Sequence, residues 1–206
     1  MNSFVNFLQE KLGKEYIKKV QSVKVGIAGC GGLGGNCAFN LVRSGVMKLR
    51  LVDNDIVEAA NLNRQFFFYD QVGKPKPDAL AENLRKINPA LELDIVKKRI
   101  SAENVKEIFK DCAIIVEALD QEQAKAMVVE NLLATAGLIV SASGIAGFGN
   151  SDRIRSHRLR KNLILIGDLV TGIDKAPPLS PAVNIAAAKQ ADAVIEYIMR
   201  KQEIIV

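Results

Sequence analysis

A glycine-rich segment with the sequence GCGGLG occupies residues 29–34, directly after the apolar run from Val23 to Ala28. In such a segment the first glycine allows a tight turn from strand to helix, and the middle glycines let a phosphate approach the backbone. The helix that follows supplies N–H donors and the positive end of its dipole. We therefore expect a nucleotide-binding loop with contacts at four glycines: Gly29, Gly31, Gly32 and Gly34.

Two acidic residues, Asp53 and Asp55, end the next apolar segment, about 20 residues after the glycines. A carboxylate at this position can accept hydrogen bonds from ribose hydroxyls, and Asp53 is the better candidate of the two. The loop and the acids together fit an NAD-dependent oxidoreductase as well as they fit an ATP-binding enzyme.

The elements that must position these residues alternate between strand and helix. After a helix over 4–20, the apolar pattern indicates strands at 23–28, 48–52, 91–96, 113–118 and 138–142, separated by helices at 36–44, 77–88, 102–109 and 121–133. These elements are followed by two closely joined strands at 152–159 and 163–166, and then by a helix from Pro181 to Lys201. This alternation predicts an α/β, Rossmann-like fold with a mostly parallel sheet, helices on both faces and a possible antiparallel extension.

The composition suits one domain, because 206 residues with 49% hydrophobic content leave little for a second core. We divide it into an N-terminal helix at about 4–20, a nucleotide-binding core at about 23–145 and a C-terminal part at about 150–206. The charge of +5 favours anionic partners, but dispersed basic residues and only 5% aromatic content argue against nucleic acid. No apolar run of about 18 residues and no leader-like start are present, so we expect a cytoplasmic protein without a membrane partner.

Three further segments separate the two nucleotide-binding classes: NLNRQ at 61–65, VGKPK at 72–76 and EALD at 117–120. With GCGGLG and LVDND, they resemble the ThiF/MoeB/ubiquitin-activating superfamily in order and spacing, over roughly residues 23–145. Five motifs in order are far more specific than any one of them. Within the superfamily, the short chain most resembles the ThiF family, the adenylyltransferases of thiamine thiazole biosynthesis.

The resemblance implies a reaction in which the C-terminal carboxylate of a small ubiquitin-like sulfur-carrier protein, ending in Gly-Gly, attacks the α-phosphorus of ATP. An acyl-adenylate forms and pyrophosphate leaves. No general base is needed, because a terminal carboxyl group with a pKa of about 3.5 is already ionised at neutral pH. The obstacle is the approach of one anion to another, so cations should dominate the site.

The same resemblance assigns the catalytic residues. Arg64 and Lys76 would neutralise the triphosphate, and Asp120 would hold Mg²⁺. Two amides, Asn61 and Gln65, would orient phosphate or a bound arginine. Taken singly, the two cations also fit solvated surface charges and the aspartate fits a helix cap, but their joint placement favours the site.

The chain departs from the superfamily at its cysteines. Many relatives carry two CxxC pairs for structural zinc, and some carry a later cysteine that captures the carrier. Here Cys30, Cys37 and Cys112 form no such pair, and no cysteine follows the last of them. We therefore expect no zinc, and a reaction that stops at the acyl-adenylate.

Relatives also bring an N-terminal arginine to the ATP of a neighbouring subunit, which implies a homodimer. No arginine precedes Arg43 here, and the candidate substitutes are Lys11, Lys14, Lys18 and Lys19. In the C-terminal part, the basic segment 152–161 fits either a docking surface for an acidic carrier or a solvated strand face. Residues 172–181 fit either a cover for the carrier's tail or a plain connector.

Three alternatives stay open. Within the superfamily, the substrate could be a small molecule or a modified tRNA base. An oxidoreductase would need a proton relay, for which the sequence offers only His157. A nucleotide-binding scaffold without catalysis is the third.

Overall fold

A computed structural model describes residues 3–172 and 174–200. Its centre is one seven-stranded sheet in the order β3-β2-β1-β4-β5-β7-β6. The strands are β1 Lys24–Ala28, β2 Lys48–Val52, β3 Glu92–Val96, β4 Ile114–Glu117, β5 Leu138–Ala142, β6 Arg155–Arg160 and β7 Leu163–Gly167. The helices are α1 Ser3–Leu12, α2 Lys14–Gln21, α3 Gly32–Arg43, α4 Lys76–Ile87, α5 Val105–Ile108, α6 Glu122–Leu132 and α7 Ser180–Arg200, with short 3₁₀ helices at Ala59–Asn61, Tyr69–Gln71 and Ser151–Arg153.

All neighbouring strands pair in parallel except β6 and β7, which pair antiparallel. Strand β1 lies between β2 and β4, so the chain reverses its direction of growth across the sheet at this point. The expected Rossmann-like sheet with an antiparallel extension is therefore confirmed. Ligands of such sheets bind beyond the carboxyl ends of the strands at the reversal.

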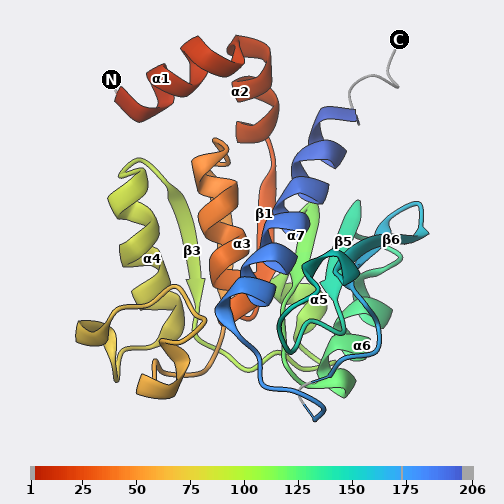
Figure 1. Ribbon diagram of the computed structural model, residues 1–206. Coiled ribbons are helices and arrows are strands. Elements are labelled where there is room, and N and C mark those ends of the chain that lie inside the picture. The colour runs from red at the N-terminus through yellow and green to blue at the C-terminus, as the bar shows by residue number, and fades with distance from the viewer. Residues whose placement is uncertain (1–2, 173, 201–206) are drawn as a thin grey trace.

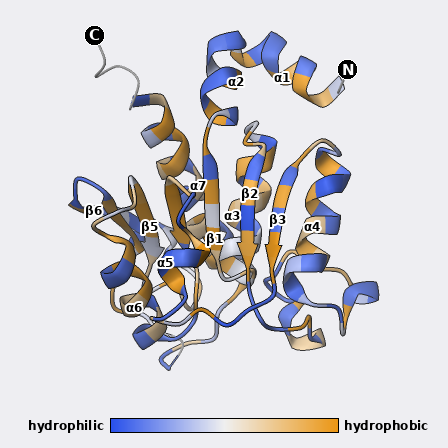
Figure 2. Ribbon diagram, turned by 180° about the vertical axis from the view of Figure 1, so that it is seen from behind, coloured by the Kyte–Doolittle hydropathy of each residue, from blue (hydrophilic) through white to orange (hydrophobic). Residues whose placement is uncertain are grey.

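Helices cover both faces of the sheet. Helices α3, α4 and α7 pack on one face, seen at the front of Figure 1, and α5 and α6 cover the opposite face, seen in Figure 2. The central strands β1, β4 and β5 are mostly apolar because both of their faces are buried, whereas the edge strand β6 is polar and largely exposed. None of the helices in the described part of the chain is long and apolar enough to cross a membrane.

Three helices differ from their predicted limits, and one of them, α3, begins at Gly32 instead of residue 36. The helix expected over 4–20 is broken in two by Gly13, whose φ of 88° no helix accommodates. The helix expected from Ala102 begins instead at Val105, because the Asn104 side chain accepts the Ser101 N–H at 2.9 Å and forms a turn. Lys201, the expected end of the last helix, lies outside the described residues.

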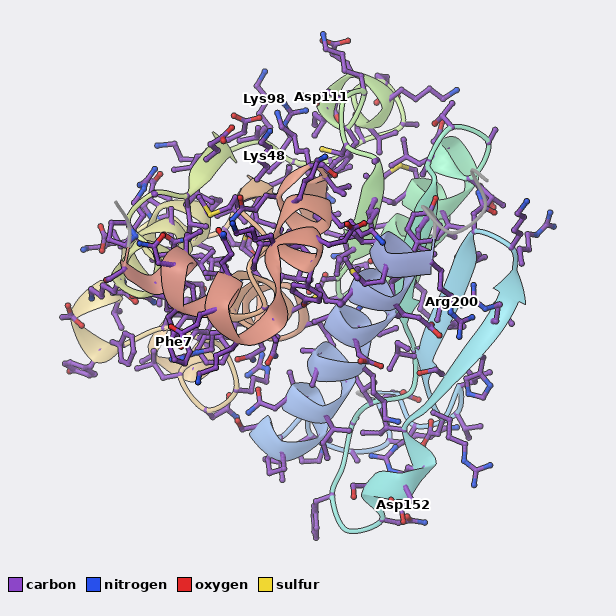
Figure 3. The ribbon with its side chains drawn as sticks, turned by 90° about the horizontal axis from the view of Figure 1, so that it is seen from above. Phe7, Lys48, Lys98, Asp111, Asp152 and Arg200 are labelled. Carbon is purple, nitrogen blue, oxygen red and sulfur yellow. The ribbon has the colours of Figure 1, made fainter. Side chains whose placement is uncertain are left out.

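An ion-pair network closes the amino-terminal edge of the sheet. The Lys24 Nζ lies 2.7 Å from a carboxylate oxygen of Asp94 and 2.7 Å from one of Asp111. Arg50 binds the same two carboxylates, so β1, β2 and β3 are tied to the segment that precedes β4. Figure 3 looks onto this edge and labels Asp111 and Lys48, the first residue of β2.

This network makes stability depend on pH. The hydrogen bond from Lys24 lowers the pKa of Asp94 and of Asp111, and Arg50 adds to it. A carboxyl group with a lowered pKa stabilises the folded state above its unfolded pKa, and this contribution is lost as pH falls through its folded pKa. We expect the urea concentration at the midpoint of unfolding to decrease as the pH is lowered below about 4. This decrease should be less steep in Asp94→Asn.

The control is Asp78→Asn, which removes an exposed carboxylate bound to Lys97 alone. If the urea midpoint decreased with acid as steeply in Asp94→Asn as in the control and the wild type, Asp94 would not be the source of the pH dependence.

Candidate functional site

A pocket of about 1130 Å³ lies at the carboxyl edge of the sheet. Each of the first five strands contributes to its wall just beyond its own end, through Gly29, Asp53, Lys98, Asp120 and Ser143. All of the predicted site residues except Gly34 line it. The structure thus gathers in one place residues that are far apart in sequence, from Gly29 to Ser143.

Two glycines shape the loop after β1 for different reasons. Gly29 has a φ of 98°, and a Cβ added to it would lie 2.7 Å from the carbonyl oxygen of Ala118. A Cβ added to Gly34 would lie 1.8 Å from the carbonyl oxygen of Gly29, closer than any side chain permits. Gly34 therefore lets α3 pack against the loop, and it lies beneath the pocket surface instead of on it.

Asp53 holds the loop from the neighbouring strand. One oxygen of its carboxylate accepts the backbone N–H of Cys30 at 2.7 Å, and the other accepts that of Asp55 at 2.9 Å. Each oxygen keeps a second lone pair, which a ribose hydroxyl can use. Burial, and next the Asp53 carboxylate, raise the pKa of the Cys30 thiol, so this cysteine stays protonated.

Lys76 is not a solvated surface charge. Its side chain is 10% exposed, and its Nζ lies 2.8 Å from a carboxylate oxygen of Asp55. Its backbone N–H also donates to the Asp55 carbonyl at 2.8 Å, which fixes the first turn of α4 against the end of β2. The lysine is therefore held in place at the pocket wall before any ligand arrives.

Arg64 lies beside the glycine loop, with its backbone carbonyl 3.5 Å from the position of a Cβ on Gly32. Its guanidinium donates to the Ala60 carbonyl at 3.0 Å and to the Asn63 side chain at 2.7 Å. Within the described residues no carboxylate pairs with it. Its charge is available to an anion in the pocket.

The two predicted amides behave differently. The Asn61 side chain accepts the backbone N–H of Glu58 at 3.1 Å and thereby closes a short 3₁₀ helix. The Gln65 side-chain oxygen is buried and has no hydrogen-bond partner in the structure. Since buried acceptors are almost always satisfied, Gln65 is the better of the two to receive a donor from a ligand.

Asp120 lies in the turn between β4 and α6 with an exposed carboxylate. It does not cap α6, because the residue at the cap position is Gln121 and no side-chain hydrogen bond is formed there. Within residues 3–172 and 174–200, no three His, Cys, Asp or Glu side chains are grouped as a metal site. A Mg²⁺ ion needs only one or two protein carboxylates when phosphates and water complete its shell, so Asp120 fits that ion.

Sequence reasoning missed several charged residues that line the pocket. Lys98 and Arg99 follow β3 and line the pocket beside β2, and Lys125 lines it from the first turns of α6. Glu117, at the end of β4, does not line the pocket itself; it is fully buried and lies 3.1 Å from the Lys125 Nζ. For Lys98 and Arg99, the signal available was their position after a predicted parallel strand.

The far wall of the pocket is built by the C-terminal part of the chain. The Asp168 carboxylate accepts the Thr171 N–H at 2.8 Å and the Thr171 hydroxyl at 2.6 Å, and it pairs with Arg153. Burial opposes ionisation of Asp168, but these hydrogen bonds, first of all those from Thr171, lower its pKa. Arg153 also donates to the Ala146 carbonyl, so two loops that line the pocket are held together.

Helices α1 and α2 lie at the opposite edge of the sheet, beyond the amino ends of the strands (Figure 1). They carry the four lysines that were candidates to replace the N-terminal arginine. None of the four lines this chain's own pocket.

Comparison with known proteins places the chain in a family. Residues 5–204 match the model of the ThiF family. The sulfur carrier protein ThiS adenylyltransferase of Bacillus subtilis is 36% identical over 120 residues, which are 57% of this chain and 36% of that protein. The adenylyltransferase and sulfurtransferase uba4 of Aspergillus clavatus is 35% identical over 136 residues, which are 66% of this chain and 28% of that protein. The chain thus spans well under half the length of these relatives.

A similar solved structure is the E. coli tRNA N6-threonylcarbamoyladenosine dehydratase TcdA in complex with ATP, with a TM-score of 0.89 over 98% of this chain and 96% of that chain. At 18% identity, the likeness shows that the two proteins share the fold.

The glycine loop gives a direct test of the geometry. We expect Gly34→Ala to lower the free energy of unfolding by about 1–3 kcal/mol or more, because the new methyl group forces α3 away from the Gly29 carbonyl. ATP binding, measured by calorimetry, should weaken with it.

Gly35→Ala is the matched control. Its methyl group would lie 3.4 Å from the nearest atom, the Cys30 carbonyl oxygen, and a helical alanine is more stable than glycine by about 1 kcal/mol. Equal stability and ATP affinity of the two variants would contradict the assigned role of Gly34.

Proposed function

The chain belongs to the ThiF family, and we propose that it is an adenylyltransferase that uses ATP to activate the C-terminal carboxylate of a small ubiquitin-like sulfur-carrier protein. The products are an acyl-adenylate and pyrophosphate. The observation that carries the proposal is the arrangement of Arg64, Lys76 and Asp120 around the glycine loop, in one pocket.

These residues meet the electrostatic demand of the reaction. Attack by a carboxylate on the α-phosphorus brings two anions together and then moves charge onto pyrophosphate. Arg64 has no carboxylate partner among the described residues, and Lys76 is held at the wall by Asp55. Both cations would neutralise phosphate oxygens of the nucleotide. The backbone N–H groups between Gly29 and Gly34 would donate hydrogen bonds to the remaining phosphate oxygens.

The ribose end of the nucleotide belongs beside Asp53, which is fixed by two backbone amides and keeps free lone pairs. Gln65 would receive a donor from the nucleotide. Asp120, across the loop from Asp53, would hold Mg²⁺, and the bound ion would neutralise charge on the phosphates. None of these residues has to act as nucleophile, because the terminal carboxylate of the second substrate does so.

The carrier tail would enter from the wall formed by Ala146 and Thr171. The Arg153–Asp168 pair fixes this wall, and an extended chain end needs such a rigid channel to reach the α-phosphorus. The name of the Bacillus subtilis relative describes adenylation of the sulfur carrier protein ThiS. It supports a ThiS-like carrier and a place in thiamine thiazole biosynthesis as the specific form of the proposal.

The reaction would end at the acyl-adenylate. Burial raises the pKa of Cys112 to about 11, and it raises the pKa of Cys30 and Cys37 as well. Thiols that stay protonated are poor nucleophiles, so none of these cysteines is suited to capture the carrier. A homodimer in the cytoplasm remains the form in which we propose that the enzyme works, since the lysines of α1 and α2 could serve only a neighbouring pocket.

The proposal predicts exchange of labelled pyrophosphate into ATP that depends on a Gly-Gly-ending carrier. Arg64→Ala and Lys76→Ala should each lower the exchange rate by about 10²–10³-fold, because each removes a cation from the charge that develops in the transition state. Lys74→Ala is the matched control, since Lys74 is two residues from Lys76 but pairs with Glu82 at the surface. Thermal unfolding of each variant checks that it folds.

Absence of exchange with every Gly-Gly-ending carrier would overturn the carrier substrate. Exchange that needs no carrier, but a small molecule or tRNA, would instead support the other activities of this superfamily.

A further inference from the structure

Glu117 is a buried carboxylate that the proposed chemistry does not use. It is the last residue of β4, the strand next to β1 at the centre of the sheet, and its side chain is 0% exposed. Buried carboxylates are costly unless they are paired and hydrogen-bonded. Its partners therefore indicate what it is for.

The partners come from three different segments. The Lys125 Nζ approaches from α6 at 3.1 Å, and the Ser141 hydroxyl donates from β5. The backbone N–H of Leu119 donates at 2.7 Å from the turn that follows β4. One carboxylate thus connects two strands, a helix and the turn between them.

The turn that Glu117 holds is the one that carries Asp120. Residues 118–121 leave β4 and enter α6, and Lys125 folds back from α6 to reach Glu117 across the base of this turn. The ion pair therefore closes the ring of residues from 117 to 125 with Asp120 on its pocket side.

A second contact fixes the start of the same ring. From α7, on the face of the sheet opposite α6, the Gln190 side chain donates to the Glu117 carbonyl at 3.2 Å and to the Val140 carbonyl at 3.3 Å. The backbone at Glu117 is thus held from α7 and its side chain from α6.

We propose that the Glu117–Lys125 pair is a positioning device that fixes the turn of residues 118–121, so that the Asp120 carboxylate faces the phosphates of bound nucleotide. A role in stability alone does not explain an ion pair at this place, because apolar side chains of similar volume stabilise a core as well or better. The inference rests on the proposed function for the identity of the nucleotide.

The test separates positioning from stability with two variants. Glu117→Met combined with Lys125→Met replaces the pair by apolar side chains, and its unfolding temperature checks that it folds, since the Leu119 N–H and the Ser141 hydroxyl also lose their acceptor. Glu117→Gln is the conservative change. In both, we expect the Kd of ATP in the presence of Mg²⁺ to rise by about 10- to 100-fold, as for other groups that orient a metal ligand. The Kd of ATP with EDTA should not change in Glu117→Gln, which keeps the Lys125 cation at the pocket wall.

A second readout needs neither metal nor nucleotide. Hydrogen exchange of the backbone amides of Leu119 and Asp120 should be faster in the double variant, because the acceptor of the Leu119 N–H is gone. The control is Glu107→Gln, which breaks the exposed pair between Glu107 of α5 and Lys110. It should change neither the Kd of ATP nor the exchange rate of these two amides.

Wild-type affinity for ATP with Mg²⁺ in both variants, or unchanged amide exchange in the double variant, would overturn the inference. A wild-type protein that binds ATP with Mg²⁺ but shows no carrier-dependent exchange would overturn the carrier proposal and leave the inference standing, provided that the variants lose that binding.

Discussion

The pocket depends on how closely α3 approaches the end of β1. The Gly34 Cα sits where any side chain would meet the Gly29 carbonyl, so α3 is in contact with the loop that precedes it. Gly32, two residues earlier, is bounded by Val183 of α7 and by the Arg64 backbone carbonyl, 3.0 and 3.5 Å from an added Cβ. The position of α3 therefore sets where the loop amides point and also where Arg64 and α7 lie. This is a constraint of space, and it explains why a glycine stands at position 34, which does not line the pocket.

Around this fixed loop, charge is distributed so that each group is held before a ligand arrives. Asp53 is oriented by two amides, and Lys76 by Asp55. Fixed charges need no rearrangement when negative charge develops, and this is the condition under which they lower a barrier most. Arg64 differs, because its guanidinium is held only by neutral oxygen acceptors. It is thus anchored, and among the residues that the structure describes no carboxylate competes for it, the combination that phosphate recognition favours.

The sequence predicted the sheet and the place of the site because both follow from strand ends. Asp53, Asp120 and the glycine loop each come directly after an apolar strand, and parallel strands bring these points to one edge. Contacts between distant segments were not accessible in this way. Nothing in the order of residues shows that Gly34 faces the Gly29 carbonyl, or that Lys125 turns back to a buried Glu117. The break at Gly13 was missed for a related reason, since the apolar stripe continues through it and only the backbone angle ends the helix.

The two ends of the pocket differ in how they are built, and this difference has a physical basis. The nucleotide end is made of backbone amides and charged side chains on strand ends, which are rigid parts of the sheet. The far end is made of loops, and it is ordered by one ion pair, Arg153–Asp168, together with the turn at Asp168. Leu169 in that turn has a φ of 64°, a conformation that costs free energy for a residue with a branched side chain. The strained turn is held by the pair and by the hydrogen bonds of the Asp168 carboxylate, so the shape of the far end depends on polar contacts.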